Sequence, residues 1–166
     1  MADETVDTLV IGGGQAGLTM SHRLKQRGIG HLVLERGRIA ERWRSERWDG
    51  LMFQFPNWSV RLPDFAFPHA DADGFSDTAA IIAFIEDYAT FVTPPIRCGV
   101  EVTKLRRDAG GFVADLAGGS IAARGVDQRH LDTGGLGMGG ELLRGMLVGP
   151  QKLDRLEAVG GSCRET

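Results

Sequence analysis

The sequence has few cysteines, no long hydrophobic run and no excess of basic residues. Cys98 and Cys163 lie 65 residues apart, a separation that suits neither a disulfide framework nor a zinc site, so we expect a reducing cytoplasm. No apolar run approaches the ~18 residues of a membrane helix, and the acidic start of the chain does not have the form of a secretory signal. The net charge of −3 argues against nucleic acid or an anionic membrane as a partner.

The sequence also lacks histidines at the spacing of metal ligands, and it lacks aromatic residues in its C-terminal part. No two of the 4 histidines share the spacing of a metal site, so we expect no bound metal. All 12 aromatic residues precede Arg124, whereas 10 of the 24 glycines lie in the last 42 residues. The 166 residues suffice for about one domain. We therefore expect residues 1–124 to form that domain, and residues 125–166 to be a Gly-rich tail that is poorly ordered or non-native in sequence.

A β-α-β unit opens the chain. Thr8–Ile11 predicts a buried strand, the following residues to about Arg27 predict a helix, and His31–Glu35 predicts a second, parallel strand. The first strand runs into the spacing Gly12-x-Gly14-x-x-Gly17. In such a turn the first glycine permits the tight bend, the second lets a phosphate approach the backbone, and the third lets the helix pack closely. The helix N-terminus then offers N–H groups to a pyrophosphate.

Glu35 narrows the choice of nucleotide. It lies 23 residues after Gly12, at the end of the second strand, where a carboxylate binds the ribose hydroxyls of a dinucleotide. A carboxylate repels a 2′-phosphate, so this first site is expected to take FAD or NAD rather than NADP.

The rest of the first 124 residues predicts a small antiparallel β-meander in an α/β fold. The expected elements are a short helix in Ile39–Trp48, an aromatic loop over Leu51–His69, a helix from Thr78 to about Phe91 capped by Asp77, and strands at Val100–Arg106, Phe112–Leu116 and Ser120–Ala123. The next residues, Gly125–His130, are neither apolar nor expected to form a strand.

A basic and aromatic cluster follows the second strand and has two readings. It consists of Arg36, Arg42, Trp43, Arg44, Arg47 and Trp48. These side chains suit phosphates and a planar ring, but they equally suit a solvated basic helix face, and the residues alone leave both readings open.

The stretch Asp7–Arg124 resembles the N-terminal FAD-binding part of bacterial flavin-dependent monooxygenases of the flavin-containing and Baeyer–Villiger type. The segments that carry the resemblance are Thr8–Gly17, Leu32–Arg36, Arg42–Arg44, Arg47–Asp49, Pro56–Trp58, Leu62-Pro63, Phe84–Tyr88 and Val100–Val102. The resemblance implies a Rossmann-like FAD-binding domain within an oxidoreductase. Such enzymes use NADPH to reduce the flavin and O₂ to oxygenate a small-molecule substrate.

The resemblance also implies roles for particular residues. Gly12, Gly14, Gln15, Ala16 and Gly17 would contact the FAD pyrophosphate. Glu35 would bind the adenosine ribose, with Arg36 beside it. Arg42 and Trp43 would line the flavin side, and the backbone of Val102 would face the adenine. The resemblance gives no catalytic residue and no oligomeric state.

The sequence departs from the family pattern after Arg124. The strand and Ala-Thr-Gly turn that close this domain in the family are missing, and Gly135–Gly140 reproduces the glycine spacing of an NADPH site only by coincidence, because no strand precedes it. We therefore expect a truncated or frame-shifted relative without its own NADPH site. One alternative is another FAD-dependent oxidoreductase such as a disulfide reductase, against which the missing Cys-x-x-Cys or Cys-x-x-x-x-Cys pair argues. The other is a non-catalytic nucleotide-binding remnant, inactive alone.

Overall fold

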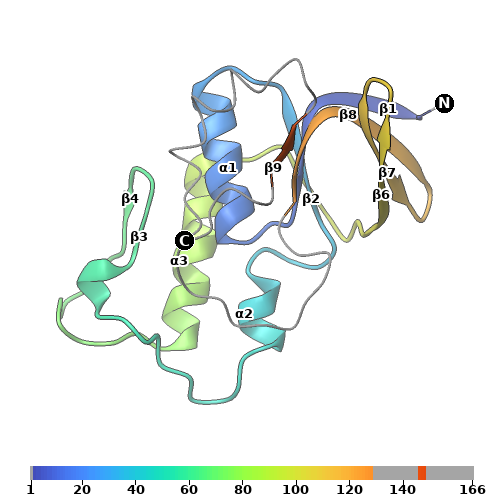
Figure 1. The fold of residues 1–166 in the computed structure, drawn as a ribbon. Helices are drawn as coiled ribbons and strands as arrows, with labels where there is room; N and C mark the ends of the chain where they lie inside the picture. Colours follow the sequence, from blue (N-terminus) through green and yellow to red (C-terminus); the bar gives the residue numbers. More distant parts are fainter. Residues whose placement is uncertain (1, 129–145, 149–166) are drawn as a thin grey trace.

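A computed structural model describes residues 2–128 and 146–148 and shows an α/β fold built on one large mixed sheet (Figure 1). Along the sheet the strands are ordered β5-β2-β1-β8-β7-β6. Their bounds are β1 Glu4–Ile11, β2 His31–Glu35, β5 Ile96–Cys98, β6 Val102–Asp108, β7 Gly111–Leu116 and β8 Gly119–Gln128. Strands β5, β2, β1 and β8 are parallel to their neighbours, whereas β6, β7 and β8 form an antiparallel meander. A three-residue strand β9 (Met146–Val148) pairs antiparallel with the end of β8.

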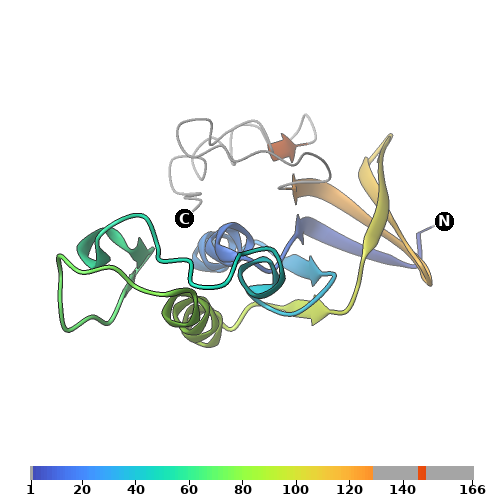
Figure 2. The ribbon, with the colours of Figure 1, turned by 90° about the horizontal axis from the view of Figure 1, so that it is seen from below.

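Strand β8 belongs to both halves of the sheet. Its first residues pair with β7, from Gly119 opposite Leu116 to Ala123 opposite Phe112. From Ile121 to its end it pairs with β1, with Ile121 opposite Glu4 and Gln128 opposite Ile11. The meander therefore curls away from the parallel strands on the side opposite the helices (Figure 2).

Helix α1 (Gln15–Gln26) covers one face of the parallel strands, and α3 (Thr78–Val92) packs against α1 on the same side of the sheet (Figure 2). Because side chains alternate along a strand, neighbouring residues of β1 enter different clusters. Val10 packs with Met20 and Leu24 of α1, whereas Leu9 packs with residues of the meander such as Phe112. Both faces of the two central strands are thus buried, at Leu9–Val10 of β1 and Leu32–Leu34 of β2, which explains the apolar runs there. Among the described residues no helix is long and apolar enough to cross a membrane.

Both long helices have ends that their sequences specify. The Asp77 carboxylate accepts from the backbone N–H of Ala80 at 2.8 Å and caps α3, as predicted. Helix α1 ends in a Schellman motif, in which Gly28 donates to the carbonyl of Lys25 and Ile29 to that of Leu24. Gly28 has φ +64°, the left-handed conformation that glycine adopts at little cost.

The aromatic loop packs against α3 and the outer side of α1. It contains a short 3₁₀ turn, η1 (Asn57–Ser59), and a hairpin of β3 (Arg61–Leu62) and β4 (Phe65–Ala66). Phe65 and Phe67 both contact the ring of Phe84 on α3, with centroid distances of 5.5 and 5.1 Å. The loop is therefore part of a second core rather than an open connection.

The α/β fold, the parallel β-α-β unit and the antiparallel meander are confirmed. One expectation is wrong, because Gly125–Gln128 continue β8 beside β1 and Val126 is buried. Gly125 and Asp127 are unfavourable in strands, so the sequence did not predict one here. The strand is stabilised by pairing with β1 on one edge and β9 on the other. The short helix α2 spans only Glu41–Ser45, and β5 and the β3–β4 hairpin were not predicted. The division at residue 124 stays a prediction, since most of the proposed tail, including Gly135–Gly140, lies outside the described residues.

His31 joins the start of β2 to α1. Its Nδ1 lies 3.0 Å from the carbonyl oxygen of Ile29, and its Nε2 lies 2.7 Å from the hydroxyl of Ser21. A carbonyl only accepts, so Nδ1 carries the proton and the neutral ring accepts from Ser21 at Nε2. Burial, with a smaller effect from the charge of Lys25, lowers the pKa of His31 below 6.5, while the bond to Ile29 opposes the change.

The lowered pKa of His31 predicts a pH-dependent stability. Between about pH 6.5 and the lower folded pKa, the unfolded chain binds the proton and the folded chain does not. The contribution of His31 is therefore complete above about pH 6.5 and is lost as the pH falls. Urea unfolding from about pH 7 to pH 5 should show a decline in the free energy of unfolding that His31→Gln reduces. The exposed His69 supplies the control, since His69→Gln should leave the decline unchanged. Equal slopes for wild type and His31→Gln would contradict this account.

Candidate functional site

The turn between β1 and α1 lies at the carboxyl end of the parallel strands. Gly12 follows β1 with φ +112°, and its N–H donates to the carbonyl of Leu34 on β2 at 2.8 Å. Gly14 is the N-cap residue of α1 and has an extended backbone, with φ −84° and ψ −172°. The sequence thus places the bend at Gly12, where the positive φ requires glycine.

Two glycines of this turn are required by contacts within the protein. A Cβ on Gly17 would lie 1.9 Å from the carbonyl oxygen of Gly12, so no side chain fits between the helix and the turn. A Cβ on Gly13 would lie 2.9 Å from Cδ1 of Ile96 and 3.0 Å from Cβ of Glu35. Ile96 is on β5, a strand of three residues that sequence reasoning missed; the β-branched residue after Pro94-Pro95 was its only signal.

Gly14 is different from its neighbours. A Cβ there would meet no protein atom within 4 Å, and the backbone angles are accessible to any residue. Neither packing nor conformation therefore explains the glycine. The space in front of Gly14 is open to a ligand.

The start of α1 is suited to an anion. Its N-cap residue makes no side-chain capping bond, and its first turn contains no acidic residue. The first N–H groups of a helix have no intrahelical partner, and the helix dipole adds a partial positive charge at this end. This is the arrangement that binds phosphate groups at helix N-termini.

Glu35 faces the glycine turn. One carboxylate oxygen accepts from the N–H of Gly13 at 2.5 Å and the other from the N–H of Gly37 at 2.8 Å. The carbonyl of Glu35 accepts from the N–H of Val100 at 3.0 Å. The chain therefore brings the first residues of β6, including the buried Val102, to the edge of the sheet where Glu35 lies.

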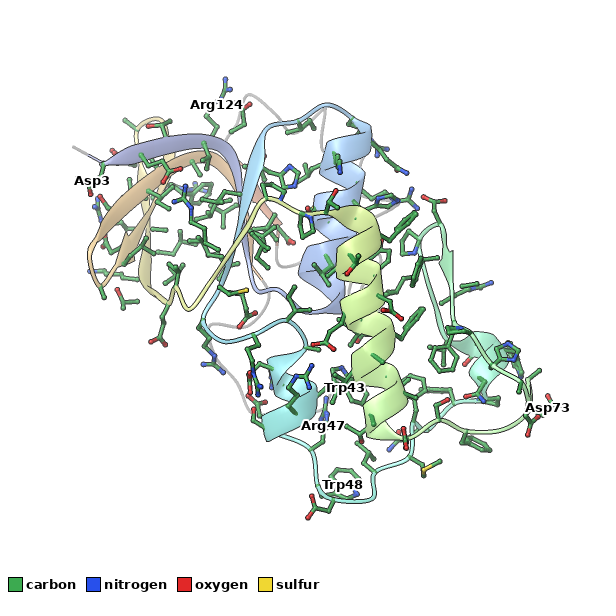
Figure 3. The ribbon with its side chains drawn as sticks, turned by 180° about the vertical axis from the view of Figure 1, so that it is seen from behind. Asp3, Trp43, Arg47, Trp48, Asp73 and Arg124 are labelled. Carbon is green, nitrogen blue, oxygen red and sulfur yellow. The ribbon has the colours of Figure 1, made fainter. Side chains whose placement is uncertain are left out.

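The predicted basic cluster is largely a network of ion pairs. Arg42 contacts Glu46 at 2.6 Å and Arg36 contacts the same carboxylate at 3.5 Å. Arg38 pairs with Glu41 at 2.7 Å, and Arg44 pairs with Glu86 on α3. Trp43, labelled in Figure 3, is half-buried. Its ring lies 6.0 Å from that of Phe53.

The structure thus gathers Gly12, Gly14, Gly17 and Glu35 around one turn. Gln15 and Ala16 form the first turn of α1, and Val102 lies nearby on β6. Arg36 and Arg42 converge on Glu46, beside Trp43 on α2, rather than on the glycine turn. Among residues 2–128, no three His, Cys, Asp or Glu side chains are grouped as metal ligands.

Comparisons with known proteins agree with this geometry. Residues 5–47 match the family described as FAD binding domain. The chain is 35% identical over 122 residues to the uncharacterized oxidoreductase CzcO-like of Geobacillus kaustophilus (strain HTA426), covering 73% of this chain and 34% of that protein. It is also 35% identical over 83 residues to the probable indole-3-pyruvate monooxygenase YUCCA1 of Arabidopsis thaliana, covering 49% of this chain and 20% of that protein.

Solved structures share the fold. A flavin-containing monooxygenase from Stenotrophomonas maltophilia is similar with a TM-score of 0.67 and 24% identity, over 74% of this chain and 37% of that one. A bacillithiol disulfide reductase from Staphylococcus aureus reaches 0.66 with 17% identity, over the same shares of the two chains. At such identities the likeness concerns the fold alone, which monooxygenases and disulfide reductases share.

The fold and the glycine turn define a dinucleotide-binding domain of the Rossmann type. Over residues 5–47 the chain is similar to an FAD binding domain, and the relatives confirm the resemblance to the N-terminal FAD-binding part of flavin-dependent monooxygenases. The chain spans about a third of the length of the first of these relatives, 34% of that protein.

Gly17→Ala should destabilise the domain whether or not a ligand is present. The added methyl group would overlap the carbonyl oxygen of Gly12, so α1 must move away from the turn. We expect a loss of about 1–3 kcal/mol in the free energy of unfolding, as for overpacked cores, measured by urea denaturation. Gly110→Ala is the control, because a Cβ at Gly110 meets no atom within 4 Å. Equal stability of the two variants would refute the packing role.

Glu35→Ala should also lower the stability of the ligand-free domain. The change removes the acceptor of two backbone N–H groups, those of Gly13 and Gly37. Leaving such donors unpaired is expected to lower the free energy of unfolding by about 1–3 kcal/mol. The exposed Glu101 provides a matched control, since Glu101→Ala should change the stability little. An unchanged urea midpoint for Glu35→Ala would show that the two bonds do not form.

Proposed function

We propose that the turn between β1 and α1 binds the pyrophosphate of FAD and that the protein acts as a flavin-dependent monooxygenase. The observation that carries the proposal is the unexplained glycine at position 14. Gly13 and Gly17 are required by packing and Gly12 by its φ, whereas Gly14 borders open space beside the positive end of α1. A side chain at position 14 would occupy the path of a diphosphate.

The pyrophosphate contacts in this proposal come from Gly12, Gly14, Gln15, Ala16 and Gly17. The last three belong to the first turn of α1, whose N–H groups point out of the helix toward the open space. The absence of an acidic residue from this turn leaves the positive end of the helix for the ligand.

In the same proposal Glu35 binds the adenosine ribose. Each of its oxygens accepts one backbone N–H, and an ionised carboxylate has about four acceptor sites, so each oxygen can accept a ribose hydroxyl as well. The two backbone bonds hold the carboxylate toward the turn. Its charge disfavours a 2′-phosphate, which supports FAD rather than NADP at this site.

The remaining contacts are assigned by their position. Arg36 follows Glu35 directly, and the backbone of Val102 lies on the strand that the Glu35–Val100 bond brings to the same edge. Arg42 and Trp43 lie on α2 on the flavin side of this arrangement. Trp43 is held by its contact with Phe53 and offers its ring to the flavin. Arg42 is paired with Glu46, so its charge is already neutralised.

The activity of the whole protein follows from the proposed cofactor. FAD held by these residues would supply the redox chemistry, with NADPH as the reductant and O₂ as the source of the transferred oxygen. The residues described above position the cofactor, and the substrate is a small molecule. We place the protein in the cytoplasm. A disulfide reductase is disfavoured, because Cys98 and Cys163 are too far apart in sequence to form its redox pair.

The proposal is tested by adding FAD to the purified 166-residue chain. Retained yellow colour after gel filtration, together with NADPH-dependent uptake of O₂, supports the monooxygenase. Colour without O₂ uptake would instead favour the alternative of a nucleotide-binding remnant. A chain that stays colourless at saturating FAD would contradict the assignment of the site.

Gly14→Val should abolish FAD binding without unfolding the protein. Valine is compatible with the extended backbone at position 14, and its Cβ meets no protein atom within 4 Å, but the side chain enters the space assigned to the diphosphate. We expect at least a roughly 100-fold loss of FAD affinity, followed by quenching of flavin fluorescence, since the diphosphate can no longer approach the backbone. Gly110→Val is matched in its open surroundings and should bind FAD as wild type does. Full flavin occupancy of Gly14→Val would place the phosphates elsewhere.

A further inference from the structure

Strand β5 contacts the glycine turn through one side chain. Ile96 is the first residue of β5 and lies beside Val33 of the parallel strand β2. Its δ1 methyl group is 2.9 Å from the position that a Cβ on Gly13 would occupy. This methyl group therefore packs directly against the backbone of Gly13, although β5 is far from the turn in sequence.

Gly13 lies between Ile96 and the side chain of Glu35. A Cβ at position 13 would lie 3.0 Å from Cβ and 3.1 Å from Cγ of Glu35. Gly13 is buried, and its N–H donates to a carboxylate oxygen of Glu35 at 2.5 Å. Contacts on both sides leave the backbone of Gly13 little room to move, as in a close-packed interior. Ile96 therefore supports the bond between Gly13 and Glu35 from the opposite side.

The backbone of β5 cannot easily withdraw from the turn. On one side of Ile96 the carbonyl of Pro95 accepts from the N–H of Val33 at 2.9 Å, and on the other side Val100 donates to the carbonyl of Glu35 at 3.0 Å. The side chain of Ile96 packs against the apolar cluster under α1 that contains Val33. Its position is thus set by pairing with β2 and by packing under α1.

We propose that Ile96 is a positioning residue of the dinucleotide site, which holds the Glu35 carboxylate where it recognises the ribose 2′-hydroxyl. A hydrogen bond depends steeply on distance and angle, so a carboxylate distinguishes a hydroxyl from a hydrogen only when neighbouring residues fix it. Ile96 fixes it through Gly13. This inference rests on the proposed function, because it concerns how the same site selects its nucleotide.

The test compares ADP with 2′-deoxy-ADP as probes of the full 166-residue chain, with binding measured by isothermal titration calorimetry. Wild type is expected to bind ADP at least 10-fold more tightly. Ile96→Val removes only the δ1 methyl group and keeps a β-branched residue that suits a strand, and it should reduce the preference at least 3-fold. Ile96→Leu keeps a δ methyl group and should retain the preference. A loss of stability alone lowers both affinities by the same factor and leaves their ratio unchanged.

Ile29→Val is the matched control. Ile29 is half-buried like Ile96 and packs against the same apolar cluster, but it follows the other end of α1. The control loses the same methyl group without touching the turn, so its preference for ADP should equal that of wild type.

A second measurement needs no nucleotide. Amide hydrogen exchange of the ligand-free chain, followed by NMR, reports on the Gly13 N–H that Glu35 accepts. Ile96→Val should speed the exchange of Gly13 at least 5-fold and leave that of Val33 unchanged, since the N–H of Val33 reports on pairing between β2 and β5.

The inference is overturned by a wild type that binds ADP and 2′-deoxy-ADP equally, by a wild-type preference in Ile96→Val, or by an equal loss of preference in Ile29→Val. Unchanged exchange of Gly13 in Ile96→Val would also overturn it, because the methyl group would then not hold the turn. A wild type that binds neither FAD nor ADP would contradict the proposed function, while the exchange of Gly13 still decides whether Ile96 positions Glu35.

Discussion

The close approach of α1 to the end of β1 sets the geometry of the site. With no Cβ at Gly17, the helix begins directly against the carbonyl of Gly12, and the first N–H groups of α1 face the carboxyl edge of the sheet. The bond from Gly12 to Leu34 ties the turn to β2, and the bond from Gly13 to Glu35 orients the carboxylate. Each contact fixes the next, so the glycine turn and the Glu35 carboxylate form one unit.

Packing on both sides of the sheet holds the glycine turn in place. The parallel strands are buried on both faces, by α1 on one side and by the meander on the other, and this burial holds the turn and Glu35 in register. The aromatic loop adds a separate core around α3. The ring of Phe53 contacts Trp43 on α2, so the position of this tryptophan depends on a part of the chain with little regular structure.

The sequence predicted what local patterns specify. The glycine spacing, the apolar strands, the Asp77 cap and the Gly28 stop each have a local physical cause, and the structure contains all four. Strand β5 and the end of β8 were missed because they depend on pairing. The three residues of β5 are too few to show the alternation of a strand. Gly125–Gln128 form a strand only because β1 lies beside them. The ion-pair partners of the arginines could not all be predicted either, because some are distant in sequence: Glu86 lies 42 residues from Arg44.

The register of β8 places its last described residue beside the glycine turn. Gln128 lies opposite Ile11, the last residue before the glycine turn. Adjacent strands are about 4.8 Å apart, so Gln128 lies at the level of the turn that we propose for the dinucleotide. Substitutions at this end of β8 therefore lie one strand away from the proposed diphosphate site.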